Sequence, residues 1–289
     1  LYKSRGQHLL TNSRVLDSIV RCSEISPDDT VLEIGPGTGN LTLKLLQQAK
    51  NVVALEIDNR MVDILQRRVA DTGLQSRLNI ICGDALKTEL PQFDLVVANI
   101  PYGISSPLLA KLLYGTNANP FRAATLLLQK EFAKRLMAEP GDSSFNRLAL
   151  NMNLMADIEF VMDVSKREFT PPPKVDSAVV KLRPRSHVPE VNLPEWCAFT
   201  RTCFGNRNRT LGASFKKKRK LMELMRFSGG HGDGEEEEEE EAELRLFRER
   251  VGGVLSSGGF ADRRPSKMSS DELLDLLALF NESGVYFHD

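Results

Sequence analysis

Short β-branched runs alternate with amphipathic stretches of helical period from residue 30 to about residue 185, and this alternation restricts the fold more than any other feature of the chain. It is typical of a doubly wound α/β domain, in which helices cover both faces of a mostly parallel sheet. The predicted strands are 31–34, 52–57, 78–82, 95–99, 125–129, 158–164 and 178–182. Apolar residues at helical spacing lie between the earlier strands, at Leu41, Leu45 and Leu46 and at Met61, Ile64, Leu65 and Val69.

The last two predicted strands are joined by residues 167–176, which leave no room for a helix. Strands connected in this way pair antiparallel, so we expect an antiparallel, hairpin-like edge of the sheet. Beyond Pro184 the pattern changes, and it predicts helices at 195–204, 211–225, 244–255 and 271–280. We therefore divide the chain into an α/β domain over residues 1–185 and a small all-α domain over residues 186–289.

The charges are unevenly distributed, although 38 Lys and Arg residues nearly balance 39 Asp and Glu residues. Between residues 201 and 220 the chain carries eight cationic side chains and no acidic one. The seven consecutive glutamates Glu235 to Glu241 follow soon afterwards, behind a glycine-rich stretch. Such a composition buries too little apolar surface to fold alone, so we expect a disordered acidic insertion at residues 228–243.

Two classes of protein are disfavoured by composition. The four cysteines, Cys22, Cys82, Cys197 and Cys203, form no C-x-x-C pair, so neither a zinc site nor a disulfide framework is expected. No apolar run approaches the roughly 18 to 20 residues that cross a bilayer, so a membrane protein is not expected.

A glycine-rich loop, Gly35-Pro36-Gly37-Thr38-Gly39, directly follows the first strand of the α/β domain. Glycines at this place allow a close approach of a nucleotide-like ligand to the backbone. A P-loop would need a Lys after the last glycine, and the dinucleotide fingerprint is G-x-G-x-x-G rather than G-x-G-x-G. Phosphoryl transfer is therefore disfavoured and NAD is the weaker candidate. Glu56, at the end of the second strand, could accept the ribose hydroxyls of either NAD or S-adenosylmethionine.

Polar residues also follow the third and fourth strands, at Asp84 and at Asn99. Open α/β sheets bind their ligands at the carboxyl ends of the strands, where all these positions fall. The segment Asn99-Ile100-Pro101-Tyr102 combines an amide oxygen, a carbonyl beside a rigid proline, and an aromatic ring. That set of groups suits a planar base with an exocyclic amine, whose two hydrogens Asn99 and the Ile100 carbonyl would accept.

These motifs together resemble the ribosomal RNA adenine N6,N6-dimethyltransferases, most closely the plant mitochondrial members of the eukaryotic branch. The resemblance covers nearly the whole chain. It is carried by Gly6-Gln7-His8-Leu9-Leu10, by residues 33–42 around the glycine loop, by Asn99-Ile100-Pro101-Tyr102, by residues 169–177 and by residues 259–264 with 280–282. It implies a Class I methyltransferase fold, Rossmann-like with a seven-stranded mostly parallel sheet, followed by the all-α domain.

The resemblance also implies roles for matching residues. S-adenosylmethionine would be bound by His8, Leu10, Gly35, Gly37, Glu56, Asp84 and Asn99. The target adenine would meet Asn99, Ile100, Pro101 and Tyr102, and Phe169 would stack on its other face. rRNA phosphates would be held by Lys174, Arg201, Arg207, Arg209, Lys216, Lys217, Lys218, Arg219 and Lys220. Gly103 departs from the family, which often has Gln or Asn there, and puts one polar contact near the target in doubt.

The implied function is dimethylation of N6 of two adjacent adenosines in the 3′-terminal hairpin loop of small-subunit rRNA, during biogenesis of the small ribosomal subunit. The expected partner is rRNA in a pre-ribosomal particle, and the expected protein is a monomer. Two alternatives stay open: a nucleic-acid-binding transcription factor on the same scaffold, and a DNA adenine methyltransferase. We expect a mitochondrial location, with the nucleus and nucleolus as the alternative.

Overall fold

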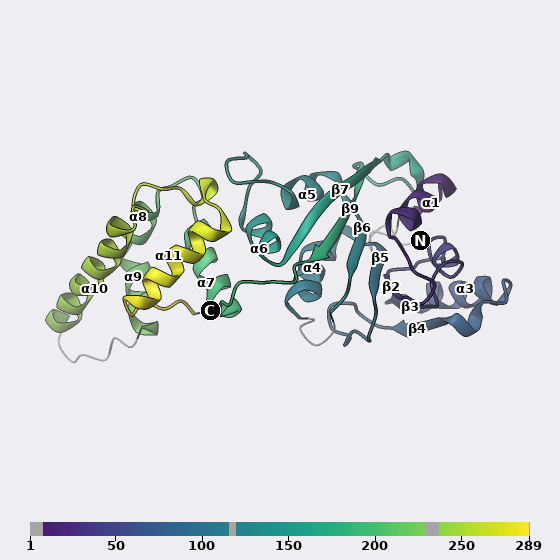
Figure 1. Cartoon of the computed structure of the whole chain (residues 1–289), viewed down its shortest axis with the longest axis horizontal. Helices are drawn as coiled ribbons and strands as arrows, with labels where there is room; N and C mark the ends of the chain where they lie inside the picture. Colours follow the sequence, from purple (N-terminus) through teal and green to yellow (C-terminus); the bar gives the residue numbers. More distant parts are fainter. Residues whose placement is uncertain (1–7, 116–119, 229–236, 289) are drawn as a thin grey trace. The chain divides into compact units, whose positions relative to one another are not determined.

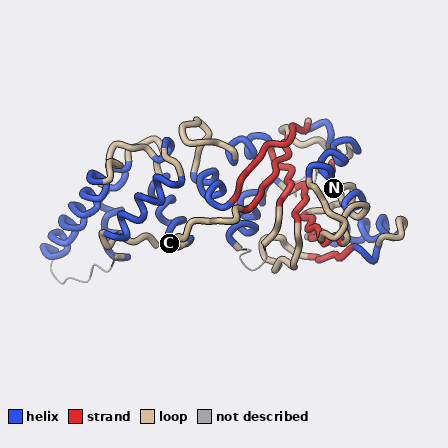
Figure 2. Tube along the Cα trace, viewed as in Figure 1, coloured by secondary structure: helices blue, strands red, loops and turns tan. Residues whose placement is uncertain are grey.

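The protein forms two compact units in a computed structural model that describes residues 8–115, 120–228 and 237–288. The first unit comprises Leu1–Met137 and Met155–His187, and the second comprises Ala138–Leu154 and Val188–Asp289. The strands of the large sheet all lie in the first unit, whereas the second is built from helices (Figure 2). The second unit includes residues 138–154, which the sequence interpretation assigns to the α/β domain.

A seven-stranded sheet forms the centre of the first unit (Figure 1). Its order is β4-β3-β2-β5-β6-β9-β7, and β9 alone runs antiparallel to its neighbours β6 and β7. The mostly parallel seven-stranded sheet predicted from the sequence is thus confirmed. The strands are β2 (Thr30–Ile34), β3 (Asn51–Glu56), β4 (Leu78–Cys82), β5 (Leu95–Asn99), β6 (Ala123–Gln129), β7 (Ala156–Val164) and β9 (Ser177–Pro184).

The central strands are mostly apolar because both faces of the sheet are covered. β5 and β6 are buried at nearly every position, which is the pattern of a parallel strand between two helix layers. The chain leaves β2 toward β3 and β4 and then returns to β5 on the other side. This reversal between β2 and β5 is the place where open α/β sheets form a ligand crevice. The helices of this unit are α1 (Ser13–Cys22), α2 (Thr42–Leu45), α3 (Asn59–Ala70), α4 (Ser105–Tyr114) and α5 (Lys130–Leu136).

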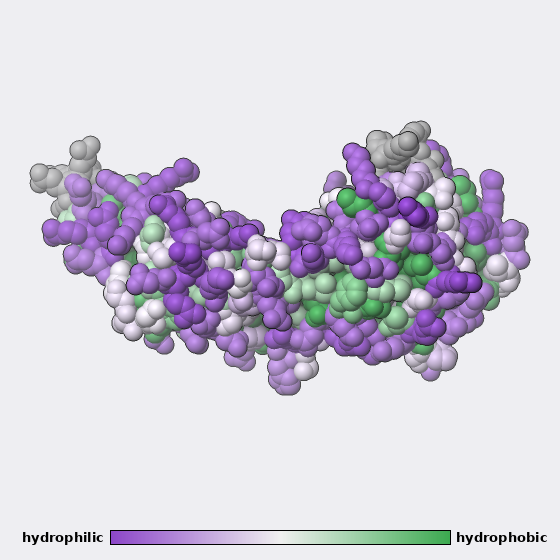
Figure 3. Space-filling model, turned by 90° about the horizontal axis from the view of Figure 1, so that it is seen from above, coloured by the Kyte–Doolittle hydropathy of each residue, from purple (hydrophilic) through white to green (hydrophobic). Residues whose placement is uncertain are grey.

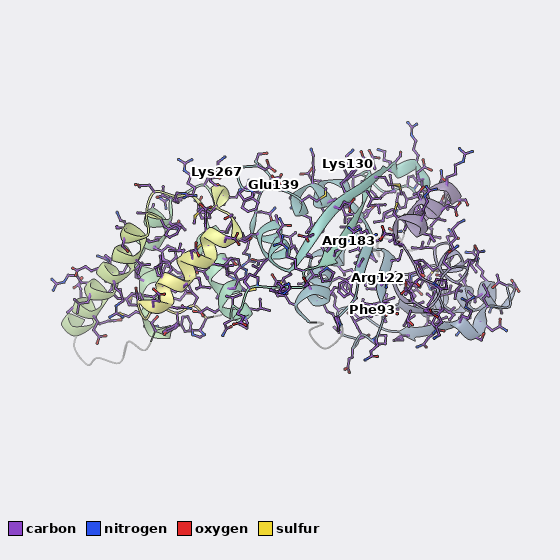
Figure 4. All side chains as sticks on the ribbon, viewed as in Figure 1. Phe93, Arg122, Lys130, Glu139, Arg183 and Lys267 are labelled. Carbon is purple, nitrogen blue, oxygen red and sulfur yellow. The ribbon has the colours of Figure 1, made fainter. Side chains whose placement is uncertain are left out.

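The antiparallel pairing predicted for the last two strands is confirmed, with one difference in their place. β9 lies between β6 and β7, so of these last two strands β7 alone lies at an edge of the sheet. Charged pairs tie this part of the unit together, including Arg122 with Asp29 (2.6 Å) and Arg183 with Glu159 (2.9 Å). Figure 4 labels both arginines in the first unit, which contains the large sheet.

A second, two-stranded sheet was not predicted. β1 (Leu9–Leu10) pairs antiparallel with β8 (Phe169–Thr170), so the N-terminal segment lies against the loop between β7 and β9. The Thr11 amide extends the pairing by donating to the Glu168 carbonyl (2.9 Å). Strands of two residues are too short to show a period in the sequence.

The second unit packs six helices around an aromatic core. They are α6 (Arg147–Met155), α7 (Leu193–Phe204), α8 (Leu211–Phe215), α9 (Lys218–Phe227), α10 (Glu237–Ser257) and α11 (Ser270–Glu282). Phe199 lies against Phe280 and Phe287 with ring centroids 6.3 and 5.0 Å apart. On the face shown in Figure 3, hydrophilic side chains cover most of this unit. None of the helices within the described residues is long and apolar enough to cross a membrane.

Residues 138–154 are fastened to the rest of the second unit by side chains that bond their carbonyls. Arg207 donates to the carbonyls of Ser143 (2.7 Å) and Phe145, and Lys267 donates to that of Gly141 (2.9 Å). Figure 4 labels Lys267 and Glu139 in the second unit. The side chains of Trp196 and Thr200 both donate to Asn151 Oδ1. These contacts explain why this segment belongs to the helical unit.

Two predictions for the helical region need correction. The single helix expected at 211–225 is divided into α8 and α9 by an extended Lys217. The division shortens the continuous helix on which five adjacent cations would repel each other at spacings of three and four residues. The acidic insertion at 228–243 is not wholly disordered, because α10 begins at Glu237. Glutamate favours helices and is stabilised at their positive N-terminal ends. Residues 229–236 of the insertion lie outside the described residues.

Candidate active site

A cavity of about 570 Å³ lies at the carboxyl ends of the strands of the first unit. Its volume is in the range of pockets that hold cofactors. The structure brings together the predicted cofactor residues and the Asn99–Tyr102 segment, which come from five separate parts of the chain. Those that line the cavity are His8, Leu10, Gly35, Gly37, Glu56, Asp84, Asn99, Ile100, Pro101 and Tyr102.

The glycine loop makes close contact with the segment after β5. Gly35 has a φ of +70° and Gly37 a φ of +56°, which side chains rarely adopt. A Cβ atom on Gly35 would lie 3.4 Å from Cδ of Pro101, in the space between the loop and the Asn99–Tyr102 segment. Both glycines therefore meet a backbone requirement and leave the cavity open.

Glu56 is the last residue of β3, and its carboxylate is hydrogen-bonded to the glycine loop. One carboxylate oxygen accepts the Gly37 amide (3.1 Å) and the other accepts the Asp58 amide (3.0 Å). A carboxylate has about four acceptor positions, so each oxygen keeps one for a ligand. The neighbouring Asp84, after β4, accepts the Leu86 amide through Oδ1 (2.9 Å). Both carboxylates are thus fixed by hydrogen bonds from the backbone, and both can accept hydrogen bonds from hydroxyl or amine groups of a ligand in the cavity.

Glu33 in β2 lines the same cavity and was not singled out from the sequence. Its side chain is 2% exposed, and one oxygen accepts the Thr42 hydroxyl (2.5 Å). Burial, with a smaller contribution from the negative charge of Glu56, raises the pKa of Glu33 to about 8. The available signal was an acidic residue inside an otherwise apolar strand, Thr30–Ile34.

The N-terminal segment covers part of the cavity through side-chain bonds to its backbone. The Asn99 amide nitrogen donates to the His8 carbonyl (3.2 Å), and the Asn40 amide nitrogen donates to the Leu10 carbonyl (2.9 Å). Asn12 donates to Glu168 at 2.5 Å and so fixes the segment to the loop before β8. Asn40 and Glu168 are positioning residues that the sequence interpretation did not assign.

Tyr102 lies between the N-terminal segment and β9. Its hydroxyl is 2.8 Å from that of Ser177, and its ring is stacked on His8 with centroids 6.2 Å apart. Burial raises the pKa of Tyr102, so the phenol stays protonated and neutral near pH 7. A flat, neutral ring of this kind is suited to stacking.

Phe169 is not brought to the cavity. It is 2% exposed and packs in the hydrophobic core with Leu10, Leu16 and Val164. Its predicted stacking on a base is therefore not available in this arrangement. Gly103 is exposed, and nothing lies within 4 Å of a Cβ atom placed on it. The space for a larger residue is present, although the polar side chain is not.

The predicted RNA-binding cations have different surroundings. Lys174 is exposed in the loop before β9, in the first unit. In the second unit the side chains of Arg201, Arg209 and Lys216 to Arg219 are exposed. Lys220 forms an ion pair with Glu223 (2.8 Å). Arg207 is half-buried and bonded to two carbonyls, so its role in this structure is to hold residues 143–145.

Comparisons with known proteins identify the family of the chain. The sequence profile described as ribosomal RNA adenine dimethylase matches residues 2–230. Over 310 aligned residues the chain is 58% identical to the mitochondrial ribosomal RNA small subunit methyltransferase of Arabidopsis thaliana, covering 100% of this chain and 81% of that protein. It is 44% identical to a probable dimethyladenosine transferase of Dictyostelium discoideum, covering 99% of this chain and 90% of that protein.

Two solved structures extend the comparison to the fold. A dimethyladenosine transferase from Plasmodium falciparum superposes with a TM-score of 0.85 at 38% identity, over 97% of this chain and 100% of that one. The 23S rRNA methyltransferase ErmE superposes with a TM-score of 0.64 at 27% identity, over 94% of this chain and 99% of that one. The resemblance stated from the motifs and the Class I methyltransferase fold are both confirmed, and the chain belongs to the ribosomal RNA adenine dimethylase family.

Proposed function

We propose that this protein transfers methyl groups from S-adenosylmethionine to N6 of adenosine in rRNA. The observation that carries the proposal is the orientation of Asn99. Its amide nitrogen is already bonded to the His8 carbonyl, so its oxygen is the group left to accept a hydrogen bond from a substrate. Among the described residues, no donor takes that oxygen.

The cavity supports S-adenosylmethionine as the cofactor. Glu56 keeps two acceptor positions for ribose hydroxyls, and Asp84 keeps its second oxygen for the adenine amine. The space beside Gly35, which a Cβ would occupy, suits the methionine part. When bound, S-adenosylmethionine supplies a methyl group on a positively charged sulfur, which is the electrophile of the reaction.

The protein's contribution to the chemistry is to orient the amine. An adenine N6 lone pair is delocalised into the ring and is therefore a weak nucleophile. Asn99 Oδ1 and the Ile100 carbonyl would accept the two N6 hydrogens and direct the lone pair toward the methyl group. Holding two reactants in this geometry can lower the activation free energy by roughly 7 to 11 kcal/mol. No ionisable base is required at the nitrogen, because the amine becomes a strong acid once the N–C bond forms and the C–S bond breaks, and it then loses its proton to water.

Tyr102 would stack on one face of the target base after the base leaves its own stack. We also propose that Phe169 contacts the other face, which requires its side chain to move from the core. Unstacking costs a few kcal/mol and is least costly in a loop. This cost favours an adenosine in a loop, and the family resemblance favours two adjacent adenosines in the 3′-terminal hairpin loop of small-subunit rRNA as the target.

The setting is proposed from the relatives. The similarity to a mitochondrial small-subunit methyltransferase favours rRNA of the mitochondrial small subunit, with the nucleus and nucleolus as the alternative. We propose that the protein acts as a monomer on a pre-ribosomal particle during small-subunit biogenesis. Lys174 and the exposed cations of residues 201–220 would hold rRNA phosphates.

The test is methyl transfer from labelled S-adenosylmethionine to unmethylated small ribosomal subunits, followed by mapping of the modified nucleotides. Asn99→Ala is expected to lower the rate at least about 100-fold, as loss of one preorganised polar group does in other enzymes. Asn79→Ala, an exposed position in β4, is the matched control and should keep the wild-type rate. Equal rates for Asn99→Ala and wild type would overturn the proposed role. Binding of rRNA without any transfer by the wild type would favour the nucleic-acid-binding alternative.

A further inference from the structure

The second unit contains a hollow of about 440 Å³ that the sequence interpretation did not anticipate. It is formed where α10 packs beside α9 (Figure 1). Its charged lining consists of Lys218 from α9 and of Glu241, Arg245 and Arg248 from α10. Only Lys218 was among the predicted RNA-binding residues.

The positions of these residues follow from helix geometry. Arg245 and Arg248 are three residues apart, so their side chains project from the same side of α10. Lys218 is the first residue of α9, directly after its N-cap Lys217. The first turn of α9 contains no acidic residue, although the positive end of a helix dipole disfavours cations and favours anions. Helix stability therefore gives no reason for this arrangement.

The charges of the hollow are not balanced. Three cationic side chains face one acidic side chain, and all four are exposed. Glu241 and Arg245 are one helical turn apart, a spacing that often gives an ion pair. Within the part of the chain that the structure describes, however, neither of them forms one. An anion entering the hollow would relieve the repulsion among the cations, and arginine forks match the oxygens of a phosphate group.

We propose that this hollow binds a phosphodiester group of the rRNA backbone, with Arg245, Arg248 and Lys218 as its ligands. Glu241 at the same hollow weakens the binding by repulsion. The inference rests on the proposed function, because the hollow continues the exposed cationic segment Lys216–Arg219. It adds two arginines of α10 to the surface that holds the substrate.

The test measures binding of a labelled 20-nucleotide single-stranded RNA to the full chain over a range of salt concentrations. Arg245→Gln/Arg248→Gln is expected to weaken binding about tenfold at low salt and to reduce the slope of log K against log salt by about 0.7, the value for one lost phosphate contact on a single strand. Arg226→Gln is the matched control, because Arg226 is exposed in the last turn of α9 and does not line the hollow. Glu241→Gln is expected to strengthen binding about twofold to threefold.

Further arms separate this inference from the proposed function. Lys216→Ala/Lys217→Ala removes two cations that lie outside the hollow. Unchanged RNA binding by this variant would contradict the proposed RNA surface itself. Two results would overturn only the hollow as a phosphate site. In the first, Lys216→Ala/Lys217→Ala weakens RNA binding but the arginine double variant does not. In the second, Glu241→Gln weakens RNA binding instead of strengthening it.

A second experiment adds inorganic phosphate at constant ionic strength, to distinguish a site for RNA phosphates from a site for the free ion. Competition with RNA supports a shared phosphate site, whereas phosphate binding without competition contradicts the proposal. Unchanged circular dichroism and S-adenosylmethionine binding show that the variants fold.

Discussion

At the scale of single residues, Glu33 is a buried acid beside a second acid. It is almost fully enclosed, it accepts only the Thr42 hydroxyl among the described residues, and Glu56 lies near enough to disfavour its charge. An acid with a raised pKa in the folded state is protonated there at a pH where the unfolded chain has lost the proton. Its contribution to stability is complete below the ordinary pKa of 4.5 and is lost as the pH rises to about 8.

We predict that Glu33→Gln makes the stability of the protein without cofactor less dependent on pH. One pKa unit corresponds to about 1.4 kcal/mol between the two protonation states, so the wild type should lose several degrees of Tm between pH 5 and pH 8. The Gln variant, which has no charge to bury, should lose clearly less. Calorimetric scans of both proteins across this range make the comparison. Parallel curves for the two would show that Glu33 titrates normally.

A second residue prediction concerns cofactor binding. Glu56→Ala is expected to weaken S-adenosylmethionine binding roughly 10- to 100-fold, because each hydrogen bond to a charged group contributes about 1.5 to 3 kcal/mol. Isothermal titration calorimetry gives the Kd. Asp63→Ala, an exposed acid on α3, is the control and should leave the Kd unchanged. A normal Kd for Glu56→Ala would mean that the ribose is bound elsewhere.

Site residues at the ends of strands could be predicted from the sequence, whereas a site residue within a strand that lines the cavity wall could not. Glu56, Asp84 and Asn99 end or follow neighbouring strands, and parallel strands bring such positions to one edge. Glu33 lies within its strand, so its access to the cavity depends on the glycine loop beside it. Phe169 shows the opposite case, because a motif can place an aromatic residue near a site without determining which side of the loop its ring faces.

At the scale of elements, the pairing of β1 with β8 joins the segment over the cofactor cavity to the loop that carries Phe169 and leads to Ser177. His8 contributes through its Nδ1, which lies 2.8 Å from the Pro171 carbonyl. The bond from Asn12 to Glu168 fixes the start of α1 to the same loop. The segment that lines the cavity and the loop before β9 are thus joined by two short strands, and we expect the two to be coupled.

We predict that Glu168→Ala weakens S-adenosylmethionine binding about threefold to tenfold, although Glu168 does not line the cavity. Loss of one charged hydrogen bond frees β1 to separate from β8, and a net effect of about 1 kcal/mol is expected. Glu159→Ala removes a carboxylate of β7 that pairs with Arg183 of β9, away from β1 and β8, and serves as the control. Hydrogen exchange of residues 9–12 should rise only in Glu168→Ala. Unchanged exchange there would contradict the coupling.

The long elements could be predicted from the sequence, and the short or interrupted ones could not. The run that became β5 is apolar at four of its five positions and ends at Asn99, so both its type and its end were visible. β1 and β8 have two residues each and depend on a partner far away in the chain. The break between α8 and α9 has no Gly or Pro to mark it. It follows from packing and from charge repulsion, which apolar periodicity does not report.

At the scale of the whole molecule, the chain crosses from the first unit to the second twice, before residue 138 and after residue 187. Arg207 connects the two segments that make up the second unit by bonding the carbonyls of Ser143 and Phe145. Its charge therefore contributes to the integrity of that unit in addition to any contact with RNA.

We predict that Arg207→Ala lowers the free energy of unfolding of the second unit by about 1 to 3 kcal/mol, because the carbonyls of Ser143 and Phe145 lose their hydrogen bonds to a charged donor. S-adenosylmethionine binding should be unchanged, since the cavity residues belong to the first unit. Urea unfolding followed by Trp196 fluorescence reports on the second unit alone, because this is the single tryptophan of the chain. Arg209→Ala, which changes an exposed neighbour, should leave the transition in place. An equal shift in both variants would argue against the anchoring role.

The insertion of β9 between β6 and β7 has a consequence for folding of the protein during its synthesis on the ribosome. β6 is almost fully apolar, and one of its edges stays unpaired until residues 177–184 have left the exit tunnel. During that interval β7 has no neighbouring strand either, because its only partner in the large sheet is β9. An open apolar edge is a template for pairing with other chains. The nascent chain is therefore most in need of chaperone protection while this late-made strand is still being synthesised.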